Sequence, residues 1–148
     1  MDRKDFLKNC GMACMSGIVM AALSQGCTQS KLLSGKIVGD DLVVPLTDFE
    51  IKNGKETYYK KYLVVHNDLL QFPLCIYRLS ENEYTALWMR CTHQGTELQV
   101  FGDKLQCPAH GSEFSNKGNV QNGPAGDKLR TFPVSLVNNQ LNISLKAV

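Results

Sequence analysis

The chain has 148 residues, of which 43% are hydrophobic and 20% are charged, and its formal net charge is +2. These values are ordinary for a globular protein and allow one domain with a modest core. They exclude the strongly basic field that nucleic-acid binding requires, so we expect no nucleic-acid partner.

Residues 1–26 have the pattern of an export signal. Three basic residues lie among the first eight, and an uncharged run, Gly11 to Leu23, follows before small residues lead to Cys27. The run is shorter than the roughly 20 residues of a membrane-spanning helix, and it is apolar on all faces, unlike an amphipathic core helix. Cationic, apolar and small-residue regions in this order are typical of a signal peptide. We therefore expect an exported protein that faces the periplasm or the cell exterior.

Two short motifs refine this prediction. "LSQGC", which ends at Cys27, resembles a bacterial lipobox whose cysteine is lipidated, although its leucine stands one place further from the cysteine than usual. "RKDFLK" resembles the twin-arginine export motif, with Lys4 in place of the second arginine, and an ordinary Sec signal is the alternative. Residues 27–36 are polar, contain Ser and Gly, and are expected to form a tether. The protein would then be anchored to the membrane through its signal or a lipid.

Residues 37–148 are expected to form the folded domain, and their pattern is that of short strands. Strand-like runs, rich in β-branched and aromatic residues, occur at 41–46, 57–67, 72–80 and 83–90. Gly102-Asp103 and Asn138-Asn139 each separate two strand-like halves and predict hairpins. Because no stretch after residue 30 has an apolar period of helical length, the sequence predicts an all-β antiparallel sandwich or barrel.

Two short loops concentrate cysteine and histidine. "CTHQG" holds Cys91 and His93, and "CPAHGSEF" holds Cys107 and His110, in a chain with only 3 histidines. Thiolate and imidazole are both metal ligands, so a zinc site with two Cys and two His is one interpretation, and a disulfide between the two cysteines is another. Zinc sites usually group like ligands together. One cysteine and one histidine on each loop suit a two-iron cluster, in which one iron takes both cysteines and the other both histidines.

Glycines and a hairpin accompany these loops. Gly95 and Gly111 follow the two histidines at two and one residues, and glycine permits the backbone conformations and close approach that a compact cluster needs. The hairpin predicted at Gly102-Asp103 would bring the loops together. Two residues that precede the loops are expected to be structural: Cys75 as a buried small hydrophobic residue, and Trp88 as core packing or a wall of the site.

The two loops together are similar to the cluster-binding signature of the Rieske [2Fe–2S] proteins. "NGPAG", residues 122–126, resembles the Gly-Pro-Ala loop that covers the cluster in the quinol-oxidising members of that family, and the resemblance extends over about residues 84–145. It implies an all-β fold, a small Rieske-type antiparallel β-sandwich or barrel with a cluster-binding subdomain of two loops. It also implies a [2Fe–2S] cluster as the cofactor.

The resemblance assigns a role to each site residue. Cys91 and Cys107 would be ligands of the inner ferric iron. His93 and His110 would be ligands of the outer, redox-active iron, at the surface where the electron partner docks. Ser112 would donate a hydrogen bond to a bridging sulfide, and such bonds raise the reduction potential because they favour the reduced, more negative cluster.

This sequence departs from the high-potential members of the family in two ways. Thr96 and Ala109 stand where those proteins have two cysteines that join the loops by a disulfide. Phe114 stands where they have a tyrosine that donates a hydrogen bond to a ligand cysteine. We therefore expect a functional cluster with a reduction potential below that of the high-potential class.

The resemblance implies one-electron transfer, with the protein as a membrane-tethered subunit of a quinol- or small-molecule-oxidising respiratory complex. Its partner would be a cytochrome or an oxidase subunit, with quinol as a further candidate. The alternatives are a soluble ferredoxin for an oxygenase and a small subunit of a periplasmic molybdenum-type oxidase. No Ser/His/Asp or paired-carboxylate constellation stands out, so we expect an oxidoreductase subunit without a substrate site of its own.

Overall fold

The computed structural model describes residues 33–146, so the predicted signal segment and Cys27 lie outside the described residues. Within this range the chain forms strands and one short 3₁₀ helix, and no helix there has the length and apolar character to cross a membrane. In chain order the elements are β1 (Leu33–Ser34), β2 (Lys36–Val38), β3 (Asp41–Pro45), η1 (Leu46–Phe49), β4 (Glu50–Asn53), β5 (Glu56–Tyr59), β6 (Tyr62–His66), β7 (Leu74–Arg78), β8 (Tyr84–Trp88), β9 (Gln99–Phe101), β10 (Lys104–Gln106), β11 (Glu113–Ser115), β12 (Val120–Asn122), β13 (Thr131–Phe132), β14 (Val134–Val137) and β15 (Gln140–Ser144).

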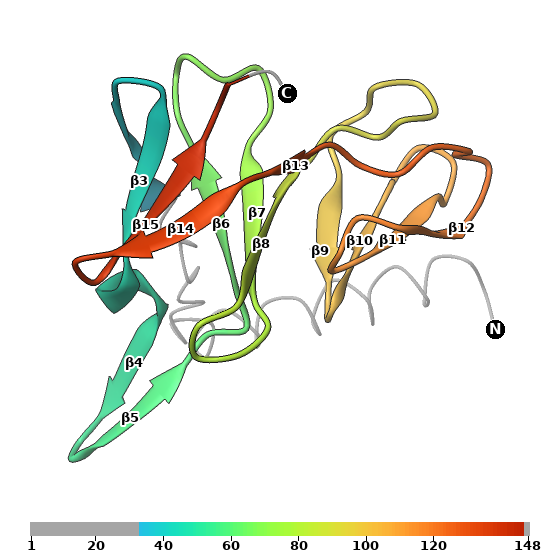
Figure 1. Ribbon diagram of the computed structural model, residues 1–148. Helices are drawn as coiled ribbons and strands as arrows, with labels where there is room; N and C mark the ends of the chain where they lie inside the picture. The colour runs from blue at the N-terminus through green and yellow to red at the C-terminus, as the bar shows by residue number, and fades with distance from the viewer. Residues whose placement is uncertain (1–32, 147–148) are drawn as a thin grey trace, which may run out of the picture. The chain divides into compact units, whose positions relative to one another are not determined.

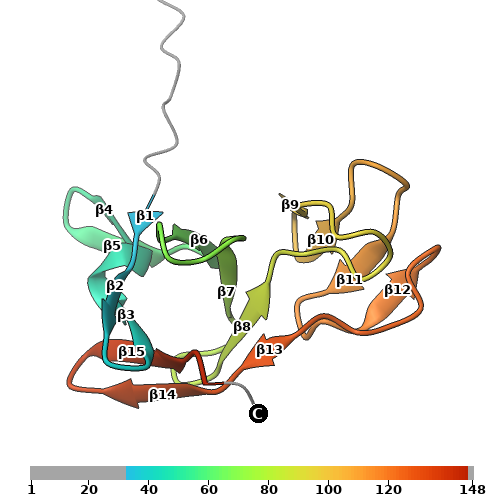
Figure 2. The ribbon, with the colours of Figure 1, turned by 90° about the horizontal axis from the view of Figure 1, so that it is seen from above.

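Two sheets face each other in a barrel-like sandwich (Figures 1 and 2). One has the order β1-β6-β7-β8-β13 and the other β14-β15-β3-β2. The chain passes from sheet to sheet at Gly35, between β1 and β2, and at Pro133, between β13 and β14. Between the sheets lies an apolar core, formed by residues such as Leu42, Val65 and Ile143, which are all 0% exposed. The all-β sandwich or barrel expected from the sequence is confirmed.

The predicted hairpins form at their predicted turns. Gly102 has a φ of 64° in the turn between β9 and β10, and the pair Lys104–Phe101 closes it. Asn138 and Asn139 both have positive φ, at 49° and 61°, between β14 and β15. Asparagine tolerates this left-handed conformation better than most residues do, so the local sequence is sufficient to specify the turn.

One predicted run is divided in the structure. Residues 57–67 form the end of β5 and then β6, with Lys60 and Lys61 between them. β5 pairs only with β4, in a hairpin that projects from the sandwich, whereas β6 enters the five-stranded sheet (Figure 1). All residues from 51 to 60 are exposed. Because the tyrosines of this run have high strand propensity in both settings, composition alone does not show the division.

The chain is already paired at β1, within the segment that we expected to be a tether. Leu33 pairs with Val65 in parallel, and the N–H of Gly35 donates to the carbonyl oxygen of His66 at 3.0 Å. A Cβ on Gly35 would lie 2.5 Å from Val65 Cγ1. Gly35 therefore provides close packing at a sheet corner rather than linker flexibility.

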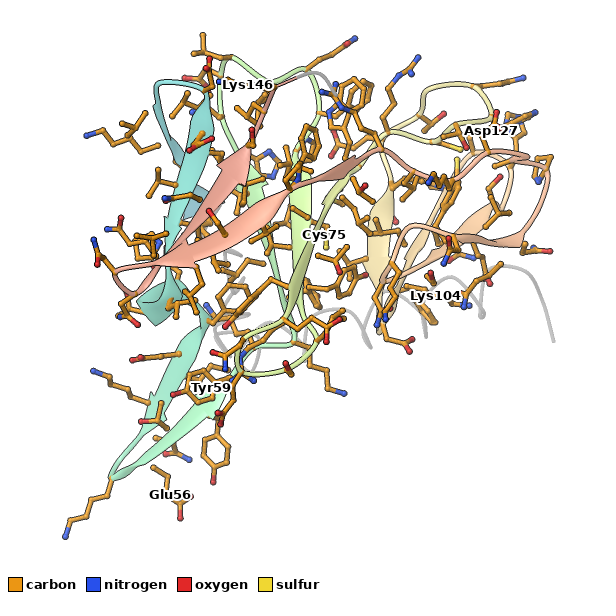
Figure 3. The ribbon with its side chains drawn as sticks, viewed as in Figure 1. Glu56, Tyr59, Cys75, Lys104, Asp127 and Lys146 are labelled. Carbon is orange, nitrogen blue, oxygen red and sulfur yellow. The ribbon has the colours of Figure 1, made fainter. Side chains whose placement is uncertain are left out.

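A third sheet, β12-β11-β10-β9, packs through a second apolar core on the other face of β7 and β8. This core includes Leu87, Leu105 and Phe114, all 0% exposed. Cys75 belongs to it, is 0% exposed, and lies between the sandwich and the third sheet (Figure 3). Its burial confirms the expected small hydrophobic residue, and the same burial raises the pKa of its thiol to about 12. The second core supports the loops that carry the candidate site.

Candidate metal centre

The two Cys-His loops share one backbone frame. In each, a glycine four residues after the cysteine donates its N–H to the cysteine carbonyl oxygen: Gly95 to Cys91 at 2.9 Å, and Gly111 to Cys107 at 3.0 Å. Both glycines adopt the left-handed conformation, with φ of 76° and 78°. Side chains rarely adopt this conformation, which explains glycine at both positions. The glycine spacing is equal when it is measured from the cysteines but not from the histidines, because His93 is two residues after Cys91 and His110 is three residues after Cys107.

A second hydrogen bond closes each loop. The N–H of Cys91 donates to the carbonyl oxygen of Thr96, and the N–H of Cys107 donates to that of Ser112, both at 2.8 Å. Thr96 and Ser112 are therefore equivalent positions in the two loops. The result is a pair of matching turns, each of which fixes the direction of one cysteine.

Each loop presents one buried thiol and one exposed imidazole. Cys91 and Cys107 are each 1% exposed and belong to the second apolar core. His93 and His110 are exposed, and their ring centroids lie 5.0 Å apart at an interplanar angle of 86°. The structure thus brings the two histidines together at the surface end of the loops, with both cysteines on the core side.

The disulfide and zinc interpretations fit this arrangement less well. Cys91 and Cys107 are free thiols rather than a disulfide. In the described part of the chain, no three His, Cys, Asp or Glu side chains gather around one point as a single-ion site would need. A two-iron cluster takes only two protein ligands on each iron. The donor set of two thiols and two imidazoles therefore fits that cofactor.

The surroundings of Cys107 favour a thiolate. Burial alone would raise its pKa, but the backbone N–H groups of His110 and Ala109, with the side chains of Cys91 and Thr96, outweigh burial and hold the pKa below its usual value. Metal ligation by cysteine requires the thiolate. The contribution of Thr96 was not expected from the sequence, where Ser112 was the predicted hydroxyl donor.

Ser112 is a buried hydroxyl at the base of the loops. It is 0% exposed, and its Oγ accepts the N–H of Ala125 at 3.0 Å. Because this bond uses a lone pair, the hydroxyl hydrogen remains available to an acceptor at the loops. That arrangement suits the role proposed for Ser112 toward a sulfide.

The third loop, residues 122–126, and the residue that follows it are joined to both Cys-His loops. Besides the bond from Ala125 to Ser112, Thr92 Oγ1 donates to the carbonyl oxygen of Asp127 at 2.7 Å. Asn122 Nδ2 donates to the carbonyl oxygen of Gly111 at 3.4 Å. Asp127 lies at the end of the domain that carries the loops (Figure 3). These hydrogen bonds hold together loops that no disulfide joins, and no sequence motif indicates them.

Thr92→Val tests this connection. Loss of the hydroxyl removes the bond to Asp127, and a typical hydrogen bond contributes about 0.5–1.5 kcal/mol to stability. We expect a lower thermal midpoint for the visible circular dichroism of the holoprotein. Thr131→Val is the matched control, because Thr131 is exposed in β13 and its side chain forms no hydrogen bond with any residue from 33 to 146. Equal midpoints for the two variants would contradict a stabilising role for Thr92.

Comparison with known sequences identifies the family. Residues 41–133 match the Rieske [2Fe–2S] domain. The cytochrome b6-f complex iron-sulfur subunit 1 of Synechocystis sp. is 39% identical over 56 residues, which cover 36% of this chain and 32% of the relative. The oxygenase component of dicamba O-demethylase from Stenotrophomonas maltophilia is 33% identical over 76 residues, covering 45% of this chain and 22% of the relative. The chain thus spans a third or less of the length of these curated relatives.

Solved structures agree with this match. The plasma membrane Rieske protein PetC3 from Synechocystis is 25% identical, with a TM-score of 0.50, and the similarity covers 57% of this chain and 86% of that one. The ferredoxin of carbazole 1,9a-dioxygenase from Nocardioides aromaticivorans shares the fold, with 19% identity, a TM-score of 0.50, and coverage of 70% and 95%. The chain therefore belongs to the Rieske [2Fe–2S] domain family, and its cofactor is the [2Fe–2S] cluster of that family.

Proposed function

We propose that this Rieske electron carrier works as a membrane-tethered subunit of a respiratory complex that oxidises quinol or a small molecule. The arrangement of the two loops, with two exposed imidazoles above two buried thiols, supports the electron-carrier part of this proposal. When bound, the cluster supplies a one-electron couple. Cys91, His93, Cys107 and His110 would hold it, two ligands from each loop.

The residues beside the two histidines in the chain carry no charge. Gln94, Pro108 and Ala109 are all exposed, and none of them carries a charge. A quinol head group, or the apolar centre of a protein interface, could approach such a surface without desolvating a charge. The imidazole edges would then be the part of the site nearest the partner, while the second core keeps water from the cysteines.

The local match to a cytochrome b6-f subunit supports a complex, and the predicted signal in residues 1–26 supports a membrane location. A second candidate function is that of an electron carrier for an oxygenase, which the match to the dicamba O-demethylase component favours. The two candidates differ in the location of the protein and in its reductant, so one experiment separates them.

Membranes and soluble extract from producing cells would be treated anaerobically with a short-chain quinol, and cluster reduction would be followed by electron paramagnetic resonance. Cells that lack the gene provide the control. We expect the reduced-cluster signal in the membrane fraction of producing cells only. A cluster found in the soluble extract, and reduced by an NADH-dependent reductase but not by quinol, would support the ferredoxin function instead.

The lipid anchor is tested at Cys27. If this residue is lipidated, Cys27→Ser should leave an unprocessed protein that incorporates no labelled lipid. Cys14→Ser, within the predicted signal, is the control and should mature normally. Unchanged maturation and labelling of Cys27→Ser would contradict the lipoprotein proposal without affecting export.

A further inference from the structure

Two arginines share one tryptophan beside the first Cys-His loop. The Arg90 and Arg130 Cζ atoms lie 5.7 Å and 5.6 Å from the ring centroid of Trp88. Arg130 also lies 4.6 Å from the ring of Phe132, and Phe72 meets Trp88 edge to face at 5.7 Å. The register explains this grouping, because Arg90 is two residues after Trp88, and the carbonyl oxygen of Arg130 accepts the Trp88 N–H at 3.0 Å.

These guanidinium groups have no internal counter-ion in the part of the chain that the structure describes. The ion pairs found there are Lys104–Glu113 and Lys146–Asp40. Glu97 faces Arg90 across an isolated antiparallel bridge, yet the two side chains form no ion pair. Both arginines are exposed. Contact with an aromatic ring uses the face of a guanidinium and leaves its N–H edge available to a carboxylate, with little side-chain entropy to lose.

The pair is adjacent to the candidate cluster site. Arg90 directly precedes Cys91, and a Cβ on Gly95 would lie 3.2 Å from Arg90 Nη2, so this guanidinium packs against the first loop. Arg130 follows three residues after Asp127, whose carbonyl oxygen binds Thr92. Both charges therefore flank the loop that presents His93.

We propose that Arg90, Trp88 and Arg130 form a docking surface for an acidic redox partner, whose carboxylates pair with the two guanidinium groups while its electron-transfer group contacts the histidine end. The uncharged residues beside His93 and His110 would provide the contact for electron transfer. The two arginines would orient the partner and raise its association rate at low salt. The proposal rests on the electron-carrier function, but its first test does not require electron transfer.

Binding of an acidic peptide tests the surface directly. Trp88 is the only tryptophan in the chain, so its emission reports on this surface. The holoprotein would be titrated with a hexaglutamate peptide at low salt, and with hexalysine for comparison. We expect saturable binding of hexaglutamate alone, a dissociation constant at least about fivefold higher in Arg90→Gln and Arg130→Gln, and partial rescue in Arg90→Lys.

Lys55→Gln is the matched control, because it removes one positive charge from the turn between β4 and β5. Glu56, the next residue, lies at the opposite end of the domain from Asp127 (Figure 3). We expect wild-type binding for this variant. An equal loss in Lys55→Gln would show an effect of net charge only, and would overturn the proposal. Binding to anionic phosphatidylglycerol vesicles that depends on the arginines, without hexaglutamate binding, would assign the surface to lipid and would also overturn it.

Small redox ions provide the second test. The reduced protein would be oxidised with ferricyanide, a trivalent anion, or with tris(phenanthroline)cobalt(III), a trivalent cation. At about 10 mM ionic strength, loss of one arginine should lower the rate of oxidation by ferricyanide roughly 3- to 10-fold and raise the rate of oxidation by the cobalt complex. Lys55→Gln should change neither rate. Equal rates in wild type and both arginine variants would contradict the proposed electrostatic role. If the cluster cannot be reduced, this oxidation experiment gives no rate, whereas the peptide titration still reports binding. Failure of the electron-carrier function can therefore be distinguished from failure of the docking proposal.

Discussion

His93→Ala and His110→Ala are each expected to lose the iron-sulfur cluster. Each removes one of only four proposed protein ligands, and alanine has no donor to replace it. The two rings lie 5.0 Å apart at the exposed end of the loops, so water could enter the vacated position. Iron and acid-labile sulfide per chain should fall to a small fraction of the wild-type content, and the visible absorption should disappear.

The third histidine provides the control for this prediction. His66 ends β6, in the five-stranded sheet, and is not part of either loop. His66→Ala should therefore keep its iron, sulfide and visible spectrum. A His93→Ala or His110→Ala protein with full iron content and an unchanged spectrum would contradict the ligand assignment.

Ser112→Ala is expected to lower the reduction potential without loss of iron. Its hydroxyl is buried and held by the N–H of Ala125, so its hydrogen can remain directed at the loops in both redox states. A hydrogen bond to a charged group is worth about 1.5–3 kcal/mol, and only the difference between the two redox states counts. Since about 59 mV corresponds to about 1.4 kcal/mol for one electron, a shift of some tens of mV, up to roughly 100 mV, is expected.

Phe114→Tyr is the complementary change. Phe114 is 0% exposed and shares the second core with Cys91 and Cys107, so a new hydroxyl there could donate to a cysteine sulfur and raise the potential. Protein-film voltammetry would measure both variants. Ser115→Ala is the control, because its Oγ accepts the N–H groups of Lys117 and Asn119 in a turn. An unmoved potential in Ser112→Ala would show that its hydroxyl donates no hydrogen bond to the cluster.

The features that the sequence predicts well are local ones. The turns at Gly102-Asp103 and Asn138-Asn139 need only the conformational preferences of the turn residues, and both hairpins form there. The order of the strands depends on pairs far apart in the chain. Examples are Leu33 with Val65, and Thr131 with Leu87. A strand's own pattern shows which face is buried but not which strand lies beside it.

The candidate site likewise has a part that the sequence predicts and a part that depends on the fold. Its cysteines and histidines lie in two short segments whose spacing indicates a mixed-ligand cluster. The bond from Thr92 to Asp127 spans 35 residues, and Asp127 lies outside the sequence motifs of the site. Thr96 was identified only as the position of a missing disulfide cysteine, and the contact of its side chain with Cys107 appears only in the fold. Such contacts depend on how the third loop lies over the other two, which is a property of tertiary structure.

Mössbauer spectroscopy of the oxidised, iron-57-enriched protein tests whether the two Cys-His loops hold a cluster whose two irons have different protein ligands. If Cys91 and Cys107 bind one iron while His93 and His110 bind the other, the two irons have different ligand sets, four sulfurs against two sulfurs and two nitrogens. We expect two quadrupole doublets of equal area with different isomer shifts. A single doublet, or protein that holds zinc and no iron after anaerobic purification, would contradict it.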